Sequence, residues 1–343
     1  MCIKKSIMKQ SILFLFLMLS YMGQAQGNDS VKLVLNKIID HAERASLYRD
    51  RVKWNALKDS VQTHALNASN VKELAPALKY LLKEIGDEHA RVFHNNQIIA
   101  YYYGNLKEHL KGFNDEVYNK IQSGQVYNFE AKILERNIGY VRIVGLPMGD
   151  NLQMTRAIED AICKLSPKKI DKWIVDLRYN GGGNLNPMAE GLAQIIGEGY
   201  VGGSQGLTST ENDHWKISNG NFYNNDYSIE SKLSCKFKKN SKVAVLTSMY
   251  TASSGEAMAV MFKGKKNTRF FGEKTLGMIT VTDWHVIDSS TAMTISVGYY
   301  KDRNGIIYDK YVDVDEVFEF IIEPLAKSDI TIHRAIAWLK NGK

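Results

Sequence analysis

The sequence predicts an α/β protein with a small helical domain ahead of the main domain. From residue 139 onward, strand-like and helix-like stretches alternate, which is the pattern of an α/β domain. Residues 28–90 carry apolar side chains at helical spacing. Near residue 129 the apolar period changes to that of strands, so we expect the main domain to cover residues 129–343. Residues 91–128 form a polar, tyrosine-rich connection.

Each element of the main domain is predicted from its own apolar pattern. We expect strands at residues 129–134, 139–144, 172–177, 243–247, 269–272, 278–286 and 292–299. Helices are expected at about 151–164, after Pro187, over 253–262 and over 330–339. Residues 198–241 are rich in Gly, Ser and Asn, and we interpret them as an excursion that could form a hairpin over a cleft.

The first 25 residues have the layout of a secretory signal peptide. Three lysines precede an apolar run from Ile12 to Leu19, and the small residues Gly23 and Ala25 follow it. The run is shorter than the roughly 20 residues of a membrane-spanning helix, which argues against the alternative of an uncleaved anchor. We therefore expect cleavage after Ala25, no transmembrane span after processing, and a secreted or periplasmic protein.

Charge and cysteine content exclude two classes of function. Processing lowers Lys plus Arg from 44 to 41 against 37 acidic residues, and a net charge of about +4 is too mild to predict nucleic-acid binding. Cys163 and Cys235 then remain, 72 positions apart, without the spacing of a structural zinc site. They either form a disulfide in an oxidising compartment or stay as buried thiols.

The first candidate site is the turn after the strand at 172–177. It reads Asp-Leu-Arg-Tyr-Asn-Gly-Gly-Gly-Asn over residues 176–184. Three glycines permit positive φ and leave N–H groups uncovered, able to bind an anion or an oxyanion. The spacing differs from the nucleotide-binding patterns, which disfavours a nucleotide. The alternative is that the glycines only make a tight turn.

The second candidate site is the turn after the strand at 243–247. It reads Thr-Ala-Ser-Ser-Gly-Glu over residues 251–256 and leads into a helix. Ser253 would lie at the positive end of the helix dipole, where an alkoxide or a tetrahedral oxyanion is stabilised. Serine is also a preferred N-cap, so Ser253 or Ser254 together with Glu256 could serve helix capping only.

A nucleophilic serine needs a base, and one histidine has a distinctive setting for it. His89 follows a helix and a glycine, within Glu-Ile-Gly-Asp-Glu-His-Ala over residues 84–90. This junction could overhang the cleft of the main domain. The other seven histidines have no comparable setting, and position alone does not establish His89 as a catalyst.

Three ordered motifs resemble the tail-specific, or C-terminal processing, serine peptidase family, and more closely its tricorn-core and retinoid-binding-protein-like branch. Residues 176–183 match the family's Asp-Leu-Arg-x-Asn-x-Gly-Gly turn, 251–256 match Thr-Ala-Ser-x-x-Glu, and 272–277 match Gly-Glu-x-Thr-x-Gly. The resemblance covers roughly residues 70–325 and implies a crotonase-like (ClpP/crotonase) ββα superhelix core. No PDZ-like insert is evident between residues 90 and 138.

By this resemblance Ser253 is the nucleophile, and the amides of Gly182 and Ser254 form the oxyanion hole, with Gly181 or Gly183 as alternatives to Gly182. The branch takes its base from a histidine in a Glu-Leu-Gly-x-x-His-Ala setting, which residues 84–90 match. The resemblance therefore implies His89 as the base.

Two positions depart from the family's pattern. Many members use a lysine just after the last motif's glycine, where this chain has Met278, and a thioether cannot accept the serine proton. Lys274 is nearby, but inside the turn. The branch also uses a downstream carboxylate, whose place is taken here by Tyr308. We expect Asp309, one place on, to substitute for it, and Glu88 is the alternative orienting acid.

The sequence thus predicts an exported serine endopeptidase that acts on polypeptides through an acyl-enzyme, without a metal or an organic cofactor. The alternative is a non-catalytic module of the same fold that binds a peptide or an apolar ligand, which Met278 and Tyr308 favour. An acyl-CoA enzyme is a weaker third hypothesis, because coenzyme A is cytosolic and the chain carries an export signal. The oligomeric state is not predicted.

Overall fold

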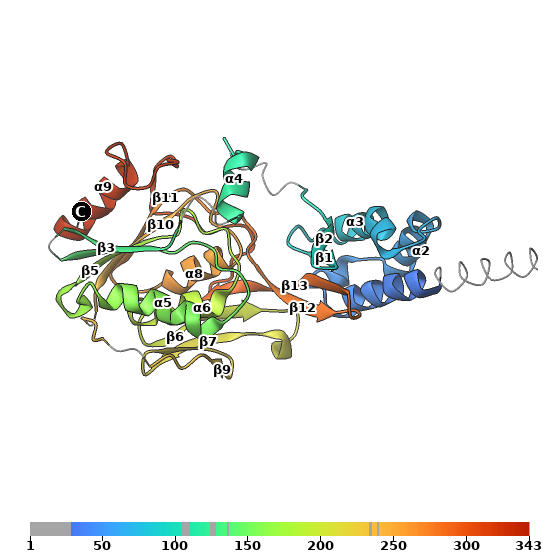
Figure 1. Cartoon of the computed structure of the whole chain (residues 1–343), viewed down its shortest axis with the longest axis horizontal. Helices are drawn as coiled ribbons and strands as arrows, with labels where there is room; N and C mark the ends of the chain where they lie inside the picture. The colour runs from blue at the N-terminus through green and yellow to red at the C-terminus, as the bar shows by residue number, and fades with distance from the viewer. Residues whose placement is uncertain are drawn as a thin grey trace, which may run out of the picture. The chain divides into compact units, whose positions relative to one another are not determined.

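The computed structural model describes residues 29–342 except 105–109, 111, 124–127, 136, 233–234 and 239 (Figure 1). The predicted signal peptide, residues 1–25, lies outside the described residues. Among the described residues, no helix has both the length and the apolar character needed to cross a membrane. The chain divides into unit 1, Met1–Gly104 with Thr282–Val297, and unit 2, Asn105–Val281 with Gly298–Lys343.

Unit 1 combines helices with a small antiparallel set of strands. A helix over residues 29–45 is followed by η1 (Arg49–Arg51), α2 (Trp54–His64), η2 (Val71–Leu74) and α3 (Ala75–Ile85). Strands β1 (Arg91–His94) and β2 (Gln97–Tyr101) pair with each other, and β1 also pairs with the first part of β13 (Thr291–Asp302). Strand β12 (Thr280–Val286) pairs with β13.

The core of unit 1 lies between its helices and these strands. It contains Leu35, Ile38, Ile39, Leu78, Leu81, Leu82, Val92, Met293 and Ile295. Helix α3 ends at Gly86, whose φ of 78° lies in the left-handed region that glycine adopts without strain. The helical spacing seen in the sequence is therefore confirmed over this part of the chain.

Unit 2 contains a six-stranded sheet in the order β14-β11-β10-β5-β4-β3. The strands are β14 (Glu316–Val317), β11 (Thr268–Gly272), β10 (Lys242–Thr247), β5 (Lys172–Asp176), β4 (Ile138–Arg142) and β3 (Glu130–Glu135). All neighbours are parallel except β3 and β4. The predicted α/β plan is therefore confirmed.

Helices cover both faces of this sheet. On one face, Val243 and Val245 pack in a core with side chains of α5 (Asn151–Cys163), α6 (Leu185–Gly191) and α8 (Ser254–Phe262). On the other face, Ala244 and Leu246 pack with side chains of α9 (Ile330–Asn341). A strand buried on both faces reads as one apolar run, which explains the pattern of residues 243–247.

Residues 198–241 form an antiparallel meander joined to the main core. Its strands are β6 (Gly199–Gln205), β7 (His214–Ser218), β8 (Asn221–Asn224) and β9 (Tyr227–Ser228), and β6 also pairs with the second part of β13. Val201, Trp215, Ile217 and Phe222 are buried in the same cluster as the apolar residues of α5 and α6. The predicted hairpin is present, and its apolar side chains belong to the core.

The remaining short elements are α4 (Asp115–Gln122), η3 (Pro167–Lys169), α7 (Ala193–Ile196) and η4 (Ser209–Glu211). The strands and helices expected for the main domain are present, with ends that differ by a few residues. The residue limits predicted for the domains stay predictions.

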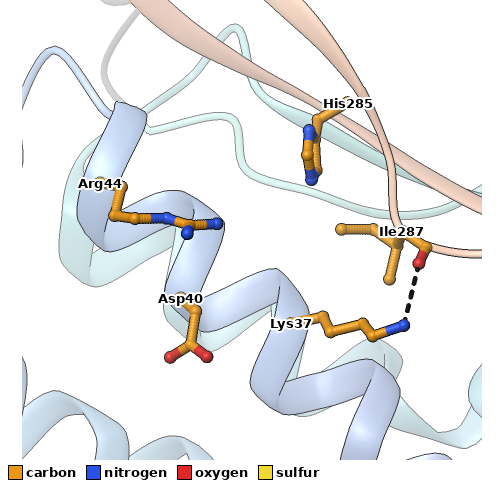
Figure 2. Close-up of a pocket in the computed structure, with 5 residues that line it drawn as sticks. All are labelled: Lys37, Asp40, Arg44, His285 and Ile287. Carbon is orange, nitrogen blue, oxygen red and sulfur yellow. Dashed lines mark hydrogen bonds between the residues drawn. The ribbon is translucent and has the colours of Figure 1, made fainter.

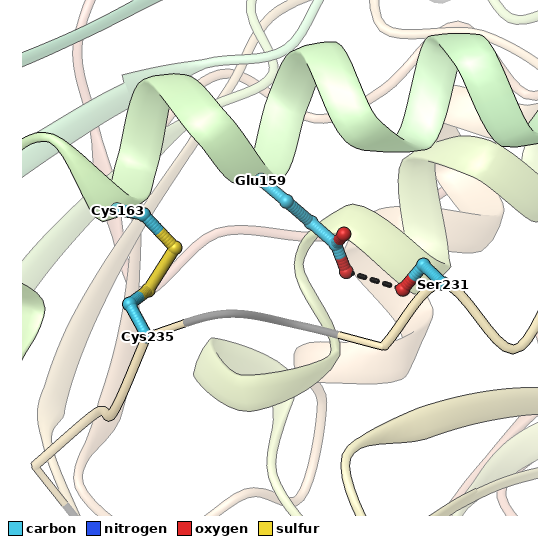
Figure 3. Close-up of a disulfide and its surroundings, with 4 residues drawn as sticks. All are labelled: Glu159, Cys163, Ser231 and Cys235. Carbon is cyan, nitrogen blue, oxygen red and sulfur yellow. Dashed lines mark hydrogen bonds between the residues drawn. A yellow bond between two sulfur atoms is a disulfide. The ribbon is translucent and has the colours of Figure 1, made fainter.

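Cys163 and Cys235 form a disulfide, with their Cα atoms 5.5 Å apart (Figure 3). The bond joins the end of α5 to the segment that follows β9. One helical turn away, the Ser231 hydroxyl donates to Glu159 Oε1 at 2.6 Å. The segment after the meander is therefore attached to α5 at two points. Of the two predicted alternatives, a disulfide or two buried thiols, the structure contains the disulfide.

Reduction of this disulfide is expected to lower the free energy of unfolding by about 3–4 kcal/mol, because the bond closes a loop of 72 positions. Urea unfolding with and without a reductant measures the difference. The variant Cys163→Ser/Cys235→Ser should have the unfolding midpoint of the reduced protein, and the reductant should not change that midpoint. Equal midpoints for the oxidised and reduced protein would contradict a structural role.

Candidate active site

The glycine turn and the serine turn leave the sheet at the same edge. Strands β5 and β10 are parallel neighbours with Asp176 opposite Leu246, so both chains emerge in the same direction. The Leu177 amide donates to the Leu246 carbonyl at 2.8 Å, and the Ala252 amide donates to the Asn180 carbonyl at 3.0 Å. These bonds hold the two predicted turns side by side.

Gly182 packs directly against Ser253. A Cβ atom at Gly182 would lie 2.8 Å from Ser253 Cβ and 3.3 Å from Ser253 Oγ, and φ at Gly182 is +106°. Any other residue there would displace the serine and strain the backbone. Gly183 is confined too, because its φ is +105° and a Cβ atom would overlap the carbonyl oxygen of Leu146. The glycines thus permit a close approach to the serine, which a simple turn does not require.

Ser253 has a backbone conformation that L-residues rarely adopt. Its φ is 53° and its ψ is −121°, and such a conformation costs about 1–3 kcal/mol. The residue precedes α8 at a sharp strand-to-helix turn and is partly exposed. A serine on a strained turn of this kind is the arrangement that presents a nucleophilic hydroxyl in α/β-hydrolases.

The two amides predicted to form the oxyanion hole, those of Ser254 and Gly182, differ in their hydrogen bonds. The Ser254 amide is the first of α8, where the helix itself offers no acceptor and the dipole is positive. The Gly182 amide donates instead to Asn180 Oδ1 at 3.0 Å. The Ser254 hydroxyl donates to the Gly183 carbonyl at 2.6 Å and so connects the two turns. The roles of Gly182 and Ser254 as oxyanion donors stay predictions.

The Glu256 carboxylate is buried beside the serine turn. Oε2 accepts the Ser253 amide at 2.9 Å, and Oε1 accepts the Thr275 hydroxyl at 2.6 Å and the Gly277 amide at 2.8 Å. Burial raises the pKa of Glu256 to about 7, although these hydrogen bonds oppose the rise. The sequence suggested only helix capping for Glu256, whereas the structure shows that it ties the serine turn to the turn at 272–277.

Met278 lies at the position where the resembling family often has lysine. Its side chain is buried in an apolar cluster with Leu276, and its Sδ accepts a weak hydrogen bond from the Tyr118 hydroxyl at 3.9 Å. The Lys274 ammonium group lies 4.6 Å from the centre of the Tyr311 ring. The structure therefore directs Lys274 to an aromatic face, and the thioether of Met278 cannot replace a catalytic lysine.

Tyr300 is a neighbour of Ser253 that the sequence analysis missed. It lies on β13, is buried, and is close enough to Ser253 for that side chain to influence the pKa of the Tyr300 hydroxyl. Burial raises the pKa of the Tyr300 hydroxyl, and the nearby Glu256 charge adds to the rise. The hydroxyl therefore keeps its proton at neutral pH. No local motif marks this tyrosine, because strand pairing alone brings it to the serine.

His89 lies in unit 1, on the partly exposed turn between α3 and β1. The buried carboxylate of Asp87 accepts the amides of His89 at 3.1 Å and Ala90 at 3.0 Å. It also accepts the amide and the hydroxyl of Ser296, each at 2.8 Å. Asp87 thereby attaches the histidine turn to β13, a role that the sequence analysis did not assign.

The two acids predicted as partners of the base lie in different units. Glu88 is in unit 1 and accepts the Gly104 amide at 3.0 Å. Asp309 is in unit 2 and is exposed, next to Tyr308, whose hydroxyl donates to the Asp302 carboxylate at 3.1 Å. The pairing of His89 with Ser253, and the choice of the orienting acid, stay predictions.

Unit 1 also contains a pocket of about 280 Å³ (Figure 2). Its lining is Lys37, Asp40, Arg44, His285 and Ile287, none of them a predicted site residue. Next to it the His41 ring stacks on His285 with ring centres 3.7 Å apart, and burial, followed by the neighbouring His285, lowers the pKa of His41 to about 4. The pocket presents charges of both signs and no serine, so the two turns of unit 2 remain the candidate site.

Glu256→Gln is expected to remove a pH dependence of stability. The pKa of Glu256 is raised from 4.5 to about 7 in the folded protein, so its contribution to stability is fully present below pH 4.5 and is lost as the pH rises through 7. The stability advantage of the parent over the variant should therefore fall by up to about 3 kcal/mol across this range.

Chemical unfolding of both proteins at pH 4.5 and pH 8 measures this change. Glu319→Gln, at an exposed carboxylate, controls for the loss of one charge. A difference between parent and Glu256→Gln that is the same at both pH values would contradict the expectation.

Comparison with known proteins places this arrangement in a family. The profile of Peptidase family S41 matches residues 137–317, just over half of the chain, including both turns and Glu256. The nisin-resistance protein of Lactococcus lactis subsp. lactis is 25% identical over 310 residues, which cover 88% of this chain and 85% of that protein.

Solved structures share the fold. A lipoprotein from Streptococcus agalactiae matches with a TM-score of 0.66 at 18% identity, covering 91% of this chain and 96% of that one. The photosystem II D1 C-terminal processing protease matches with a TM-score of 0.50 at 16% identity, covering 84% and 92%. These likenesses confirm the predicted fold. The profile match confirms the resemblance seen in the three motifs, and the chain belongs to peptidase family S41, as a serine-type peptidase.

Proposed function

We propose that this protein is an exported serine endopeptidase with Ser253 as nucleophile and His89 as general base. The observation that carries the proposal is the strained backbone of Ser253 with Gly182 packed against it at the start of α8. An ordinary N-cap residue has extended backbone angles and needs no such strain. Helix capping alone therefore leaves the conformation unexplained, whereas a nucleophile that must project from a sharp turn accounts for it.

In the proposed reaction, His89 takes the Ser253 hydroxyl proton while Oγ bonds to the carbonyl carbon of a peptide. The oxyanion accepts hydrogen bonds from the amide of Ser254 and from the glycine turn. For Gly182 to act as an oxyanion donor, its amide must break its hydrogen bond to Asn180 Oδ1 and donate to the oxyanion instead. Gly183 is the alternative donor. The C–N bond then breaks, the amine leaves with the proton from His89, and water deprotonated by His89 hydrolyses the ester.

Export is supported by three observations. The first 25 residues have the pattern of a signal peptide. The disulfide between Cys163 and Cys235 is typical of an oxidising compartment. The Streptococcus agalactiae protein of similar fold is described as a lipoprotein. We therefore propose a secreted or periplasmic location.

The proposed substrates are polypeptides in extended conformation. Strand addition at a sheet edge supplies affinity through backbone hydrogen bonds and demands few particular side chains. The Lactococcus lactis relative is named for nisin resistance, so nisin belongs among the first polypeptides to test. Asp309 is proposed to orient His89.

The rival function is a non-catalytic binding module on the same fold. The observation that favours it is Met278, which lies in an apolar cluster at the position of the lysine that many members use. A module of this kind would bind peptides without forming a covalent bond to Ser253. Covalent labelling therefore separates the two functions.

Ser253→Ala is expected to abolish labelling by a fluorophosphonate probe at neutral pH, because the probe bonds only to an activated serine hydroxyl. The parent should be labelled and should cleave a polypeptide substrate. His89→Ala should lower kcat by at least about 1000-fold. The matched control is His94→Ala on β1, whose ring contacts the Thr291 hydroxyl at 3.0 Å; it should retain activity. A parent that binds peptide but takes no label would support the binding module.

Asp309→Asn is expected to lower kcat by about 100-fold or more, because an amide does not hold the imidazole in the tautomer that accepts the serine proton. The measurement is turnover of the same peptide, compared with Glu88→Gln at the alternative acid. A large loss in Glu88→Gln with none in Asp309→Asn would assign the orienting role to Glu88 instead.

A further inference from the structure

Helix α4 contacts the glycine turn through the side chain of its last residue, Gln122. Gln122 Nε2 donates a hydrogen bond to the Gly181 carbonyl oxygen at 2.7 Å. We infer that Gln122 is a positioning residue, which holds the Gly181–Gly182 peptide in the orientation that keeps the Gly182 amide from the oxyanion. The inference rests on the proposed function, in which Ser253 is the nucleophile and the glycine turn supplies an oxyanion donor.

This peptide group is held at both of its ends. The Gly181 carbonyl and the Gly182 amide belong to one planar trans peptide, in which the C=O and N–H bonds point in opposite directions. Gln122 binds the carbonyl end, and Asn180 Oδ1 accepts the amide end at 3.0 Å. A rotation of the peptide breaks both hydrogen bonds together. For the Gly182 amide to turn toward an oxyanion, the Gly181 carbonyl must therefore leave Gln122.

The absence of a side chain at Gly181 lets Gln122 approach the turn this closely. A Cβ atom at Gly181 would overlap Gln122 Nε2 and would lie 2.8 Å from its Cδ. Gly181 thus faces Gln122, as Gly182 faces Ser253. A peptide between two glycines also has the widest choice of backbone angles, so the sequence permits this one to rotate. The turn therefore combines a peptide able to change orientation with a side chain that opposes the change.

Helix α4 is anchored to unit 2 by contacts other than that of Gln122. The Asn114 amide, at the start of the helix, donates to the Tyr250 hydroxyl at 3.1 Å. The Tyr118 side chain is buried in the apolar cluster that contains Met278. The side chain of Gln122, in contrast, is exposed. Its replacement should therefore remove the hydrogen bond to the glycine turn without detaching the helix.

Gln122→Met removes the hydrogen-bond donor and keeps the length of the side chain, so it tests the inference. We expect labelling of Ser253 by the fluorophosphonate probe, whose phosphoryl oxygen occupies the oxyanion position, to rise about 2- to 10-fold, the usual worth of one hydrogen bond. The kcat for a cleaved peptide should rise by the same factor, with KM within a factor of about two. Gln122→Glu should give a similar rise at neutral pH, because a carboxylate cannot donate to the Gly181 carbonyl.

The matched control is Ser123→Ala, at the exposed residue that follows Gln122. The Ser123 hydroxyl donates to the Lys120 carbonyl at 3.0 Å, within the same end of α4. This variant should label and turn over at the parent's rate.

Hydrogen exchange of single glycine amides, followed by NMR with isotope-labelled glycine, gives a readout that does not depend on activity. An amide exchanges only after it leaves its acceptor, so the Gly182 amide should exchange about 2- to 10-fold faster in Gln122→Met than in the parent. The Gly277 amide, which donates to Glu256, should exchange at the same rate in both proteins.

Three results would each overturn the inference while leaving Ser253 as nucleophile. They are labelling of Gln122→Met at or below the parent's rate, an equal rise in Ser123→Ala, and an unchanged exchange rate of the Gly182 amide. A parent that neither labels nor cleaves peptide would instead overturn the proposed function itself.

Discussion

The hydrogen bonds to the buried Glu256 carboxylate maintain the geometry of the candidate site. One oxygen binds the Ser253 amide, and the other binds the Thr275 hydroxyl and the Gly277 amide. A buried carboxylate is costly unless its oxygens are hydrogen-bonded, so these donors are required where Glu256 lies. A residue in a strained conformation persists only when its surroundings over-determine it. Glu256 helps to fix the conformation of Ser253, because its hydrogen bonds hold the serine turn against the turn at residues 272–277.

Much of this site could be predicted from local sequence because its two turns follow two apolar strands. A strand buried on both faces is recognisable from an apolar run such as residues 243–247, and the small residues after it mark a turn. Parallel strands then bring the ends of both runs to one edge. The sequence could therefore predict that the glycine turn and the serine turn lie next to each other. The short distance between Gly182 and Ser253 depends on backbone angles that no residue pattern specifies.

The contacts that the sequence did not reveal are the long-range ones. Strand β13, which contributes to both units, brings Tyr300 near Ser253 and carries Ser296, whose hydroxyl donates to Asp87. An isolated tyrosine or aspartate has no periodicity and belongs to no motif, so only pairing in the folded chain identifies its partner. The disulfide was also undecided, because the pattern of a buried helix around Cys163 suits a thiol and a disulfide equally.

Most side chains of the glycine-turn motif have structural roles. The Arg178 guanidinium is buried between Asp176 at 2.7 Å and Asp329 at 2.9 Å, and Asp329 caps α9. Breaking a buried pair of this kind leaves an uncompensated charge and costs several kcal/mol. The Asn180 carbonyl accepts the Ala252 amide of the serine turn. Gly182 is the residue of this motif that packs against Ser253, the proposed nucleophile. Asp176, Arg178 and Asp329 anchor the glycine turn to the sheet and to α9. This anchoring holds the backbone of Gly182, which has no side chain, beside Ser253.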